Sequence, residues 1–396
     1  MFGWWRRHSD GILQQLPAER LLALDVFRGL TITAMILVNN PGSWAYIYAP
    51  LRHAEWHGWT PTDLIFPFFI FIVGISLQLS MSRRQASTGK TIQAAAIRSA
   101  KLFVLGLILA LSYYNFRDAS FSWVEQRLLS VRWLGVLQRI SLVYFCTVLI
   151  VLSFASKGRV VAMLLLSALY LVGLWWLPYQ DAAGNSFRGL LEFGNSFPAW
   201  LDHTLLGANH LYYKSAEPFA FDPEGLWSTL PAISSCLAGV LTAQFLQCEK
   251  PLYQKIYWFL GIGLLCVIAA ELWHLWLPIN KPLWTPSYVL LSTGYALLVL
   301  AACLWLCDIR CYRRWTAPFV VFGANAILFF MAAGLAARLL SMLPVGTTVL
   351  QPWLYREWFQ PVFGNYNGSL AFALCFLLLA YGLMYGCYRK GWIWKV

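Results

Sequence analysis

The chain has 396 residues, of which 59% are hydrophobic and only 12% carry a charge. A water-soluble domain usually has about 25% charged residues, so this composition excludes a soluble enzyme, a nucleic-acid-binding module and a disordered protein. The formal net charge of +12 therefore has to be interpreted from where the basic residues lie along a membrane protein.

Ten apolar stretches are long enough to cross a membrane, which takes about 20 residues of helix. We predict an all-α, polytopic membrane helical bundle with about ten transmembrane helices. The predicted spans are Leu22–Asn40, Thr62–Ser82, Ala100–Tyr114, Trp133–Phe154, Val160–Leu177, Leu226–Leu246, Ile256–Leu277, Tyr288–Leu306, Pro318–Leu343 and Ser369–Tyr388.

The basic residues predict which side of the membrane holds the termini. An even number of spans puts both termini on one side, and 19 of the 29 basic residues fall on that side with only five acidic ones. The positive-inside rule then makes both termini cytoplasmic. Residues 1–21 become a cytoplasmic N-terminal segment without the apolar core of a signal peptide, and residues 22–396 a single integral membrane domain.

The long loops all fall on the opposite, extracytoplasmic side, at residues 41–61, 115–132, 178–225 and 344–368. Five of the six histidines lie in these loops or at an outer helix end. Long loops with titratable side chains often carry function, so we expect the site on this side.

The nine cysteines lie in apolar runs or at helix ends, which argues against a disulfide framework. Cys303, Cys307 and Cys311 repeat at helical spacing, but no histidine or second cysteine pair completes a ligand set. We therefore expect no metal site.

The first outer loop contains the main catalytic candidate. His53 stands at a membrane boundary, where a neutral imidazole could act as a general base, although a histidine there can also simply hydrogen-bond a loop. Thr60, Pro61 and Asp63 fit the start of the next helix, so a capping box explains Asp63 without catalysis. Glu55, His57 and Lys214 are candidate substrate contacts.

Other polar groups of the outer half have less specific patterns. The run Asp222-Pro223-Glu224-Gly225 reads as the start of the sixth span. Glu271 and His274 are one helical turn apart and could pair. A polar cluster in the long loop matches no closed metal site and comprises Asp202, His203, Asn209 and His210.

Polar residues inside predicted spans are functional candidates because burying them in a membrane is costly. Asp25 and Arg28 share a helix face and can pair. Asn39 follows Arg28 by eleven residues, or roughly 16 Å of helix rise. The remaining ones are Gln138, Arg139 and Asn325, the last of which could equally serve helix–helix hydrogen bonding.

Several blocks in chain order resemble the transmembrane heparan-α-glucosaminide N-acetyltransferase family, in its bacterial type. They extend from about Leu21 to the C-terminus, so the resemblance covers the fold rather than one motif. The blocks are Leu24–Leu30, Val38-Asn39, His53–Gly58, Asp63–Phe71, Gly135–Arg139, Leu206–Tyr212, Asp222–Gly225, Ile279–Trp284 and Tyr388–Lys395.

The resemblance implies acetyl transfer from cytosolic acetyl-CoA, a co-substrate, to the amine of a glucosamine-type sugar across the membrane. It implies His53 and Asn39 as catalytic residues. With the polar candidates above, we expect substrate contacts from Asp63, Glu55, His57, His210, Glu224 and Lys281, and cofactor contacts from Asp25, Arg28, Gln138 and Arg139.

The chain departs from the family pattern in two places near His53. His57 replaces an asparagine, and the loop between Asn39 and His53 is about three residues longer. These departures concern the acceptor more than the reaction. The expected partners are a small amino sugar or the terminal glucosamine of a glycan, membrane lipid, no nucleic acid, and a second copy as a homodimer.

Two other functions fit the same spans. Buried Arg139 and a net-neutral outer half would suit a transporter, and an O-acyltransferase of a cell-envelope glycan would share the acetyl-CoA half of the mechanism. The compact chain suggests a bacterial inner membrane, with the loops facing the periplasm.

Overall fold

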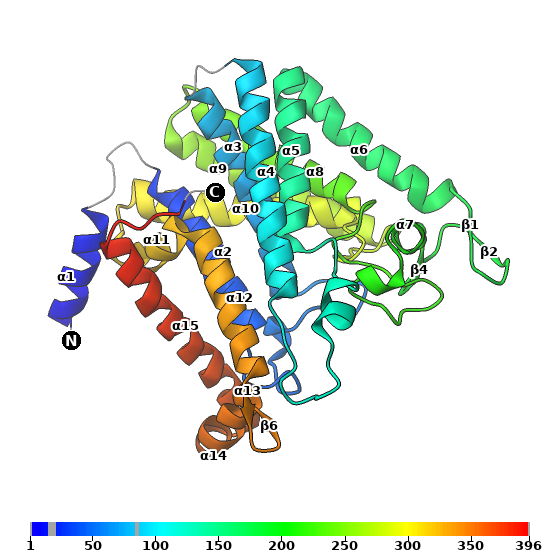
Figure 1. Cartoon of the computed structure of the whole chain (residues 1–396). Coiled ribbons are helices and arrows are strands. Elements are labelled where there is room, and N and C mark those ends of the chain that lie inside the picture. Colours follow the sequence, from blue (N-terminus) through cyan, green and yellow to red (C-terminus); the bar gives the residue numbers. More distant parts are fainter. Residues whose placement is uncertain (1, 15–20, 84–86, 395–396) are drawn as a thin grey trace.

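The computed structural model describes residues 2–14, 21–83 and 87–394 of the chain. Long helices dominate it, and its only strands form three short hairpins in that part of the chain (Figure 1). By length and hydropathy nine helices in the described residues could cross a membrane, or ten if one bent pair counts as a span. The prediction of an all-α bundle of about ten spans is confirmed.

The observed helices follow the predicted spans closely at most ends. The long membrane helices are α2 (Leu22–Asn39), α3 (Ile65–Ser82), α4 (Thr88–Leu111), α5 (Val136–Ser153), α6 (Ser156–Trp176), α8 (Thr229–Gln247), α9 (Leu252–His274), α10 (Pro286–Leu304) and α15 (Asn365–Arg389). The third span begins earlier than predicted, at Thr88, because polar residues such as Lys90 extend its exposed first turns.

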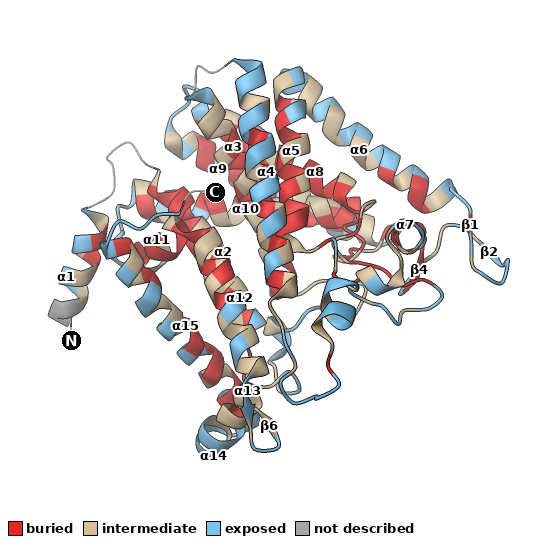
Figure 2. Cartoon of the chain, in the orientation of Figure 1, coloured by how far each residue is buried: buried red, intermediate tan, exposed pale blue. Residues whose placement is uncertain are grey.

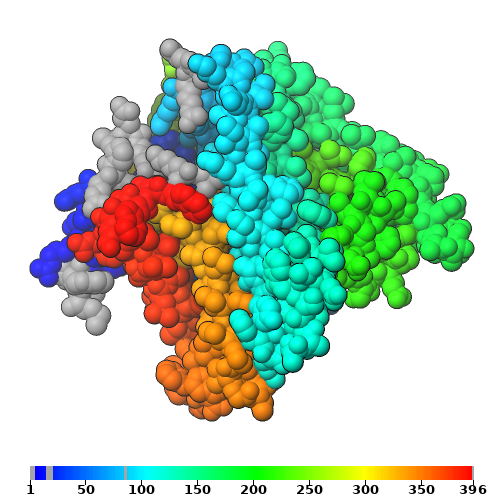
Figure 3. Space-filling view, viewed as in Figure 1, coloured from blue at the N-terminus to red at the C-terminus, as the bar shows by residue number. Residues whose placement is uncertain are grey.

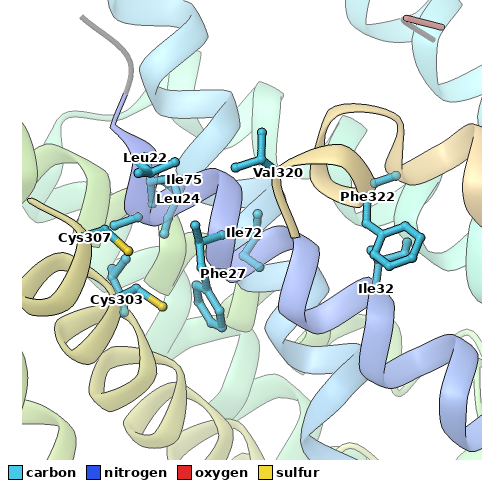
Figure 4. Packing of buried hydrophobic residues seen from close by; sticks show 14 of the residues in the cluster. Leu22, Leu24, Phe27, Ile32, Ile72, Ile75, Cys303, Cys307, Val320 and Phe322 are labelled. Carbon is cyan, nitrogen blue, oxygen red and sulfur yellow. The ribbon is translucent and has the colours of Figure 1, made fainter. Parts of the chain in front are cut away.

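The two largest apolar clusters of the core both include residues of α10. The first gathers around α2 and includes Phe27, Ile32 and Cys303 (Figure 4). The second lies between α3, α4, α5 and α8. Helix α8 is 72% buried whereas α6 is only 17% buried, so α8 runs through the interior and α6 along the periphery (Figure 2).

Close helix crossings depend on small residues. A Cβ on Gly29 of α2 would lie 1.9 Å from the carbonyl oxygen of Phe319, and one on Gly74 of α3 would lie 2.0 Å from that of Cys236. Only glycine lets the backbones approach this closely, as in many membrane helix pairs. These contacts fix α2 against α11 and α3 against α8.

The ninth predicted span, Pro318–Leu343, is not one helix. It divides into α11 (Ala317–Ala324) and α12 (Ala326–Met342), which meet at Asn325 with a bend of 77°. Asn325 is buried; its side-chain amide donates to the carbonyl of Trp392, and its Oδ1 accepts from the backbone of Trp394. Asn325 therefore binds the C-terminal segment rather than another helix.

Short elements fill the outer loops. The hairpins are β1 (Tyr179–Gln180) with β2 (Ser186–Phe187), β3 (Leu191–Glu192) with β4 (Asn195–Ser196), and β5 (Pro344–Val345) with β6 (Thr348–Val349). The loop 178–225 also holds α7 (Phe197–Leu206) and a small aromatic core of its own, built on Tyr179, Phe197, Phe219 and Phe221. This loop is thus a folded platform that touches the first outer loop through Trp56.

The remaining short elements lie near helix ends. They are α1 (Phe2–Leu13), α13 (Leu350–Leu354), α14 (Gln360–Phe363), η1 (Ala49–Leu51), η2 (Pro61–Leu64), η3 (Val124–Leu128), η4 (Ala208–His210), η5 (Trp305–Ile309), η6 (Arg314–Thr316) and η7 (Tyr355–Phe359). All nine cysteines are free thiols, as predicted, and Cys303 and Cys307 pack as small apolar side chains beside Leu22 and Phe27 (Figure 4).

Candidate active site

His53 and Asp63 form a hydrogen-bonded pair in the first outer loop. The Nδ1 atom of His53 lies 2.6 Å from Oδ1 of Asp63. The imidazole is half exposed whereas the carboxylate is only 2% exposed. A carboxylate beside Nδ1 favours the tautomer with its proton on Nδ1, which leaves Nε2 as the basic nitrogen.

Asp63 has the predicted capping role and a second role that the sequence did not reveal. Its other oxygen, Oδ2, accepts from the backbone N–H groups of Ala54 and Thr60, each at 3.0 Å. The capping box with Thr60 at the start of η2 is complete. These bonds hold the carboxylate in one orientation, so the cap itself positions the group that orients His53.

Lys281 joins this pair from the turn between α9 and α10. Its ammonium nitrogen lies 3.3 Å from Oδ1 of Asp63 and 3.1 Å from Nδ1 of His53. Burial lowers the pKa of Lys281, while Asp63 and Glu224 act against that shift. His53 and Lys281 are 228 positions apart in sequence, and both contact Oδ1 of Asp63.

The same turn anchors the rest of the first loop. The Asn280 amide donates to the carbonyl of Trp56 at 2.9 Å and lies 3.3 Å from Nδ1 of His57. Burial lowers the pKa of His57, and His274 adds to the effect. Glu55 is exposed beside this anchored stretch. His57 and Glu55 lie in the same loop as His53, and their role as substrate contacts stays a prediction.

The three tryptophans of the first loop differ in their surroundings. Trp56 donates from its indole to the carbonyl of Leu191 at 2.7 Å and packs against Phe193 and Phe221. Trp59 donates to Glu271, which replaces the predicted contact of Glu271 with His274. Trp44 is 65% exposed and so is the most exposed of the three.

Asp222 and Glu224 do not start the sixth span, which begins later, at Thr229. Both carboxylates instead bind Arg132, which donates to Asp222 at 2.7 and 2.5 Å and to Oε2 of Glu224. Burial acts to lower the pKa of Arg132, but the two carboxylates raise it above its usual value. Arg132 in turn holds the pKa of Glu224 below its usual range despite burial.

Arg132 is a residue that the sequence reasoning missed. Its guanidinium carbon also lies 4.7 Å from the centre of the Tyr212 ring. Arg132 thus contacts Tyr212 as well as the turn before α8. In the sequence Arg132 is a basic residue at the end of a long loop, and nothing in its neighbourhood distinguishes it from the other basic residues of the loops. Its two acidic partners are about 90 residues away in sequence and only the fold brings them near.

Arg139 and Gln138 lie at the start of α5 but have different environments. Arg139 is fully buried, donates to the carbonyl of Gly225 at 3.1 Å and to Oγ of Ser228, and has Trp284 against its guanidinium. The Gln138 amide packs against Gly106 of α4. Arg139 therefore belongs to the outer group with Glu224, whereas Gln138 lies at a helix contact.

Asp25 and Arg28 form the predicted pair, with 3.6 Å between Oδ1 and Nη1. Arg28 also donates to the carbonyl of Gly323 at 3.1 Å, in the last turn of α11. Both residues lie in the first half of α2, and Asn39 is at its other end. The four predicted cofactor residues therefore do not form one cluster.

The two remaining predicted residues have clear positions. Asn39 is exposed in the last turn of α2, a helix that contacts η2, where Asp63 lies. His210 places Nδ1 2.7 Å from the carbonyl of Val131, with its ring beside Trp133. His210 thus ties the loop 178–225 to the loop 115–132.

The expected polar cluster of the long loop does not assemble as a ligand set. Asp202 accepts from the backbone of Leu226, and Nδ1 of His203 accepts from that of Ala220. Among the described residues no group of three His, Cys, Asp or Glu side chains is arranged to hold a metal ion. The contacts of these residues hold the loop together instead.

Comparison with known proteins identifies relatives of the chain. Residues 20–247 match the family model for heparan-alpha-glucosaminide N-acetyltransferase, catalytic. The chain is 28% identical to the Homo sapiens heparan-alpha-glucosaminide N-acetyltransferase, over 97% of its own length and 61% of that protein's. For the Mus musculus protein of the same name the values are 27%, 96% and 61%, so the chain spans about three fifths of both relatives.

Proposed function

Because the chain belongs to the heparan-alpha-glucosaminide N-acetyltransferase family, we propose that it is a transmembrane acetyltransferase using cytosolic acetyl-CoA and a glucosamine-type acceptor on the extracytoplasmic side. The resemblance expected from the sequence is confirmed by the family match. The observation that carries the proposal is the His53–Asp63 pair, with the imidazole open to the outer loops and its carboxylate partner buried.

In the proposed reaction His53 acts as the general base. Nε2 takes a proton from the acceptor ammonium, and the free amine attacks the thioester carbonyl of acetyl-CoA. An N–C bond forms as the C–S bond breaks, and the thiol leaves with the second amine proton. Asp63 stabilises the imidazolium that forms and fixes its tautomer, as carboxylates beside catalytic histidines do.

Two further groups are assigned supporting roles. We assign the Asn39 amide to the thioester oxygen, where a hydrogen bond would strengthen as negative charge develops. We assign Glu224 to the acceptor, since Arg132 holds it ionised and its side chain is 12% exposed. We assign Lys281 a positioning role, in which its contact with Asp63 holds the His53–Asp63 pair in place.

The donor would approach from the side of the termini. The Asp25–Arg28 pair lies beside the break between α11 and α12, where Arg28 donates to the carbonyl of Gly323. A guanidinium suits a phosphate oxygen, so we assign Arg28 to the donor. The proposed location is a bacterial inner membrane, with both termini cytoplasmic and the loops 41–61, 115–132, 178–225 and 344–368 periplasmic.

The test is transfer from radiolabelled acetyl-CoA to glucosamine and glucosamine-terminated sugars by purified protein in lipid nanodiscs. We expect product with the wild type and a loss of roughly 10² or more for His53→Ala. His203→Gln is the matched control, because His203 contacts the backbone of Ala220 in another outer loop. Acetyl trapped on His53 by acid quench would distinguish a two-step route from direct attack.

Each negative result has a defined meaning. Failure of the protein to bind acetyl-CoA by calorimetry would overturn the acetyltransferase proposal in favour of a transporter. Acetyl esters in place of amides would indicate an O-acyltransferase of a cell-envelope glycan. Equal activity of His53→Ala and wild type would remove His53 from the mechanism.

A further inference from the structure

A cavity of about 390 Å³ lies where the N-terminal helix α1 packs against the last turns of α15. Its lining comes from both helices and includes Arg7, His8, Gly11, Tyr385 and Arg389. Figure 3 shows the blue surface of α1 beside the red end of the chain, at one edge of the molecule. The volume falls within the range of small-molecule sites, which is about 300–1,000 Å³.

Specific contacts hold α1 in this position. Nε2 of His8 lies 2.7 Å from the hydroxyl of Tyr381, and the ring centres of His8 and Tyr385 are 4.5 Å apart. Asp10, the single acidic residue of α1, binds Arg314 of η6 at 3.1 Å and does not line the cavity. The cavity is therefore bounded by packed elements, and the acidic group of α1 is engaged elsewhere.

The charge of this cavity is positive. Arg7 and Arg389 come from opposite ends of the chain, and both are exposed. Neither forms an ion pair within residues 2–14, 21–83 and 87–394. Burial lowers the pKa of His8, so the positive charge near pH 7 comes from the two guanidinium groups. Their forked N–H donors fit the oxygens of a phosphate.

The surroundings of the cavity favour a phosphate that belongs to a lipid. Helix α15 is one of the candidate membrane spans, and Arg389 is its last residue. Leu379, Gly382 and Gly386 come before it at spacings of three and four residues, so they share a side of the helix, and all are exposed. A Cβ on either glycine would meet no atom within 4 Å. This side of α15 is therefore open to an acyl chain as far as Arg389.

We propose that the cavity between α1 and α15 binds the phosphate of an anionic phospholipid, with Arg7 and Arg389 as its ligands and an acyl chain along α15. A headgroup without an ammonium to balance its phosphate suits two guanidinium groups best. The inference uses the proposed cytoplasmic position of both termini, where the membrane surface carries anionic lipid. It goes beyond acetyl transfer, because the bound lipid would fasten the two ends of the chain to each other.

Native mass spectrometry of the full chain tests the charges, with phosphatidylglycerol and phosphatidylcholine as probes. We expect the first phosphatidylglycerol to bind roughly tenfold more tightly, with the difference shrinking as ionic strength rises. Arg7→Gln and Arg389→Gln should each weaken its binding about tenfold. Arg6→Gln and Lys390→Gln are the matched controls, because each removes the same charge from a neighbouring exposed position that does not line the cavity.

A variant that keeps every charge tests the cavity itself. Gly11 lines the cavity, and a Cβ on it would meet no atom within 4 Å, so Gly11→Leu should fill the space without strain. It should weaken phosphatidylglycerol binding as the arginine variants do and fold as well as the wild type, because leucine favours a helix over glycine. Gly89→Leu is the control, since Gly89 is equally open but lies at the start of α4.

Three results would contradict the site. Equal affinity for the two lipids, or an equal loss in Arg6→Gln and Arg7→Gln, would reduce it to general surface charge. Unchanged binding by Gly11→Leu would show that the lipid does not occupy the cavity. Displacement of the lipid by inorganic phosphate would make a free phosphate the ligand. Because lipid binding and not acetyl transfer is measured, the site and the proposed function can each fail without the other.

Discussion

His53 and Asp63 are ten residues apart in sequence, and their side chains meet at 2.6 Å across the turn that starts the second membrane span. The carboxylate that orients the imidazole is the same one that caps this turn through Ala54 and Thr60. A single side chain therefore couples the start of the span to the position of His53, and removing it should affect both.

We expect Asp63→Asn to lower kcat by roughly 10² to 10⁴, because an amide cannot stabilise the imidazolium or enforce its tautomer. The amide oxygen can still accept one capping bond, so the melting temperature should fall by only a few degrees. Steady-state kinetics and thermal unfolding in the same nanodiscs measure the two effects. Retention of more than a third of wild-type kcat would show that the pair is only structural.

Arg132→Gln should raise KM for the acceptor about tenfold or more with a smaller change in kcat. The loss of the guanidinium leaves Asp222 and Glu224 without their countercharge, and removing one partner of a buried pair is costly. A lower melting temperature should accompany the change. Arg132→Lys should recover only part of the effect, because an ammonium cannot bind two carboxylates with a fork of donors. A KM equal to that of the wild type would disconnect Glu224 from acceptor binding.

Gly323→Ala should destabilise the contact between α2 and α11. A Cβ at this position would lie 2.5 Å from the carbonyl oxygen of Asp25, so the helices must separate, at a cost of about 1–3 kcal/mol. Thermal unfolding with Gly382→Ala as control provides the measurement, since a Cβ on Gly382 meets no atom within 4 Å. Equal melting temperatures of the two variants would contradict the tight crossing.

Asn325→Ala should release the C-terminal segment from the bend between α11 and α12. The variant loses the bond to the carbonyl of Trp392 and the bond from the backbone of Trp394. Hydrogen exchange at residues 392–394 should then become about tenfold faster or more. Asn185→Ala, in the exposed turn between β1 and β2, serves as control because it should not change exchange there. Unchanged protection in Asn325→Ala would mean that other contacts hold this segment.

Stability should depend on pH through Asp202, whose pKa is raised to about 7 mainly by burial. Its folded value exceeds the ordinary value of 3.8, so its contribution is complete below about pH 4 and is lost as pH rises through 7. Asp202→Asn should therefore flatten the fall in melting temperature between pH 4 and 7. An Asp202→Asn profile parallel to that of the wild type would place the titrating group elsewhere.

The sequence by itself determined the membrane architecture and the loop that carries His53. Long apolar runs specify spans because only helices satisfy the backbone inside a bilayer, and the His53–Gly58 and Asp63–Phe71 blocks indicated the family. A capping pattern at Thr60 and Asp63 was also readable, because it depends on neighbouring residues alone.

Only the tertiary structure decided which distant residues share a site. Lys281 reaches Asp63, Arg132 reaches Asp222 and Glu224, and Arg28 reaches Gly323, across 90 to 295 residues of sequence. It also replaced one predicted span by two helices at Asn325 and separated Gln138 from Asp25. Hydrophobic periodicity depends on neighbouring residues and therefore does not predict such long-range pairs. The pairs form only when helices and loops that are distant in sequence pack against one another.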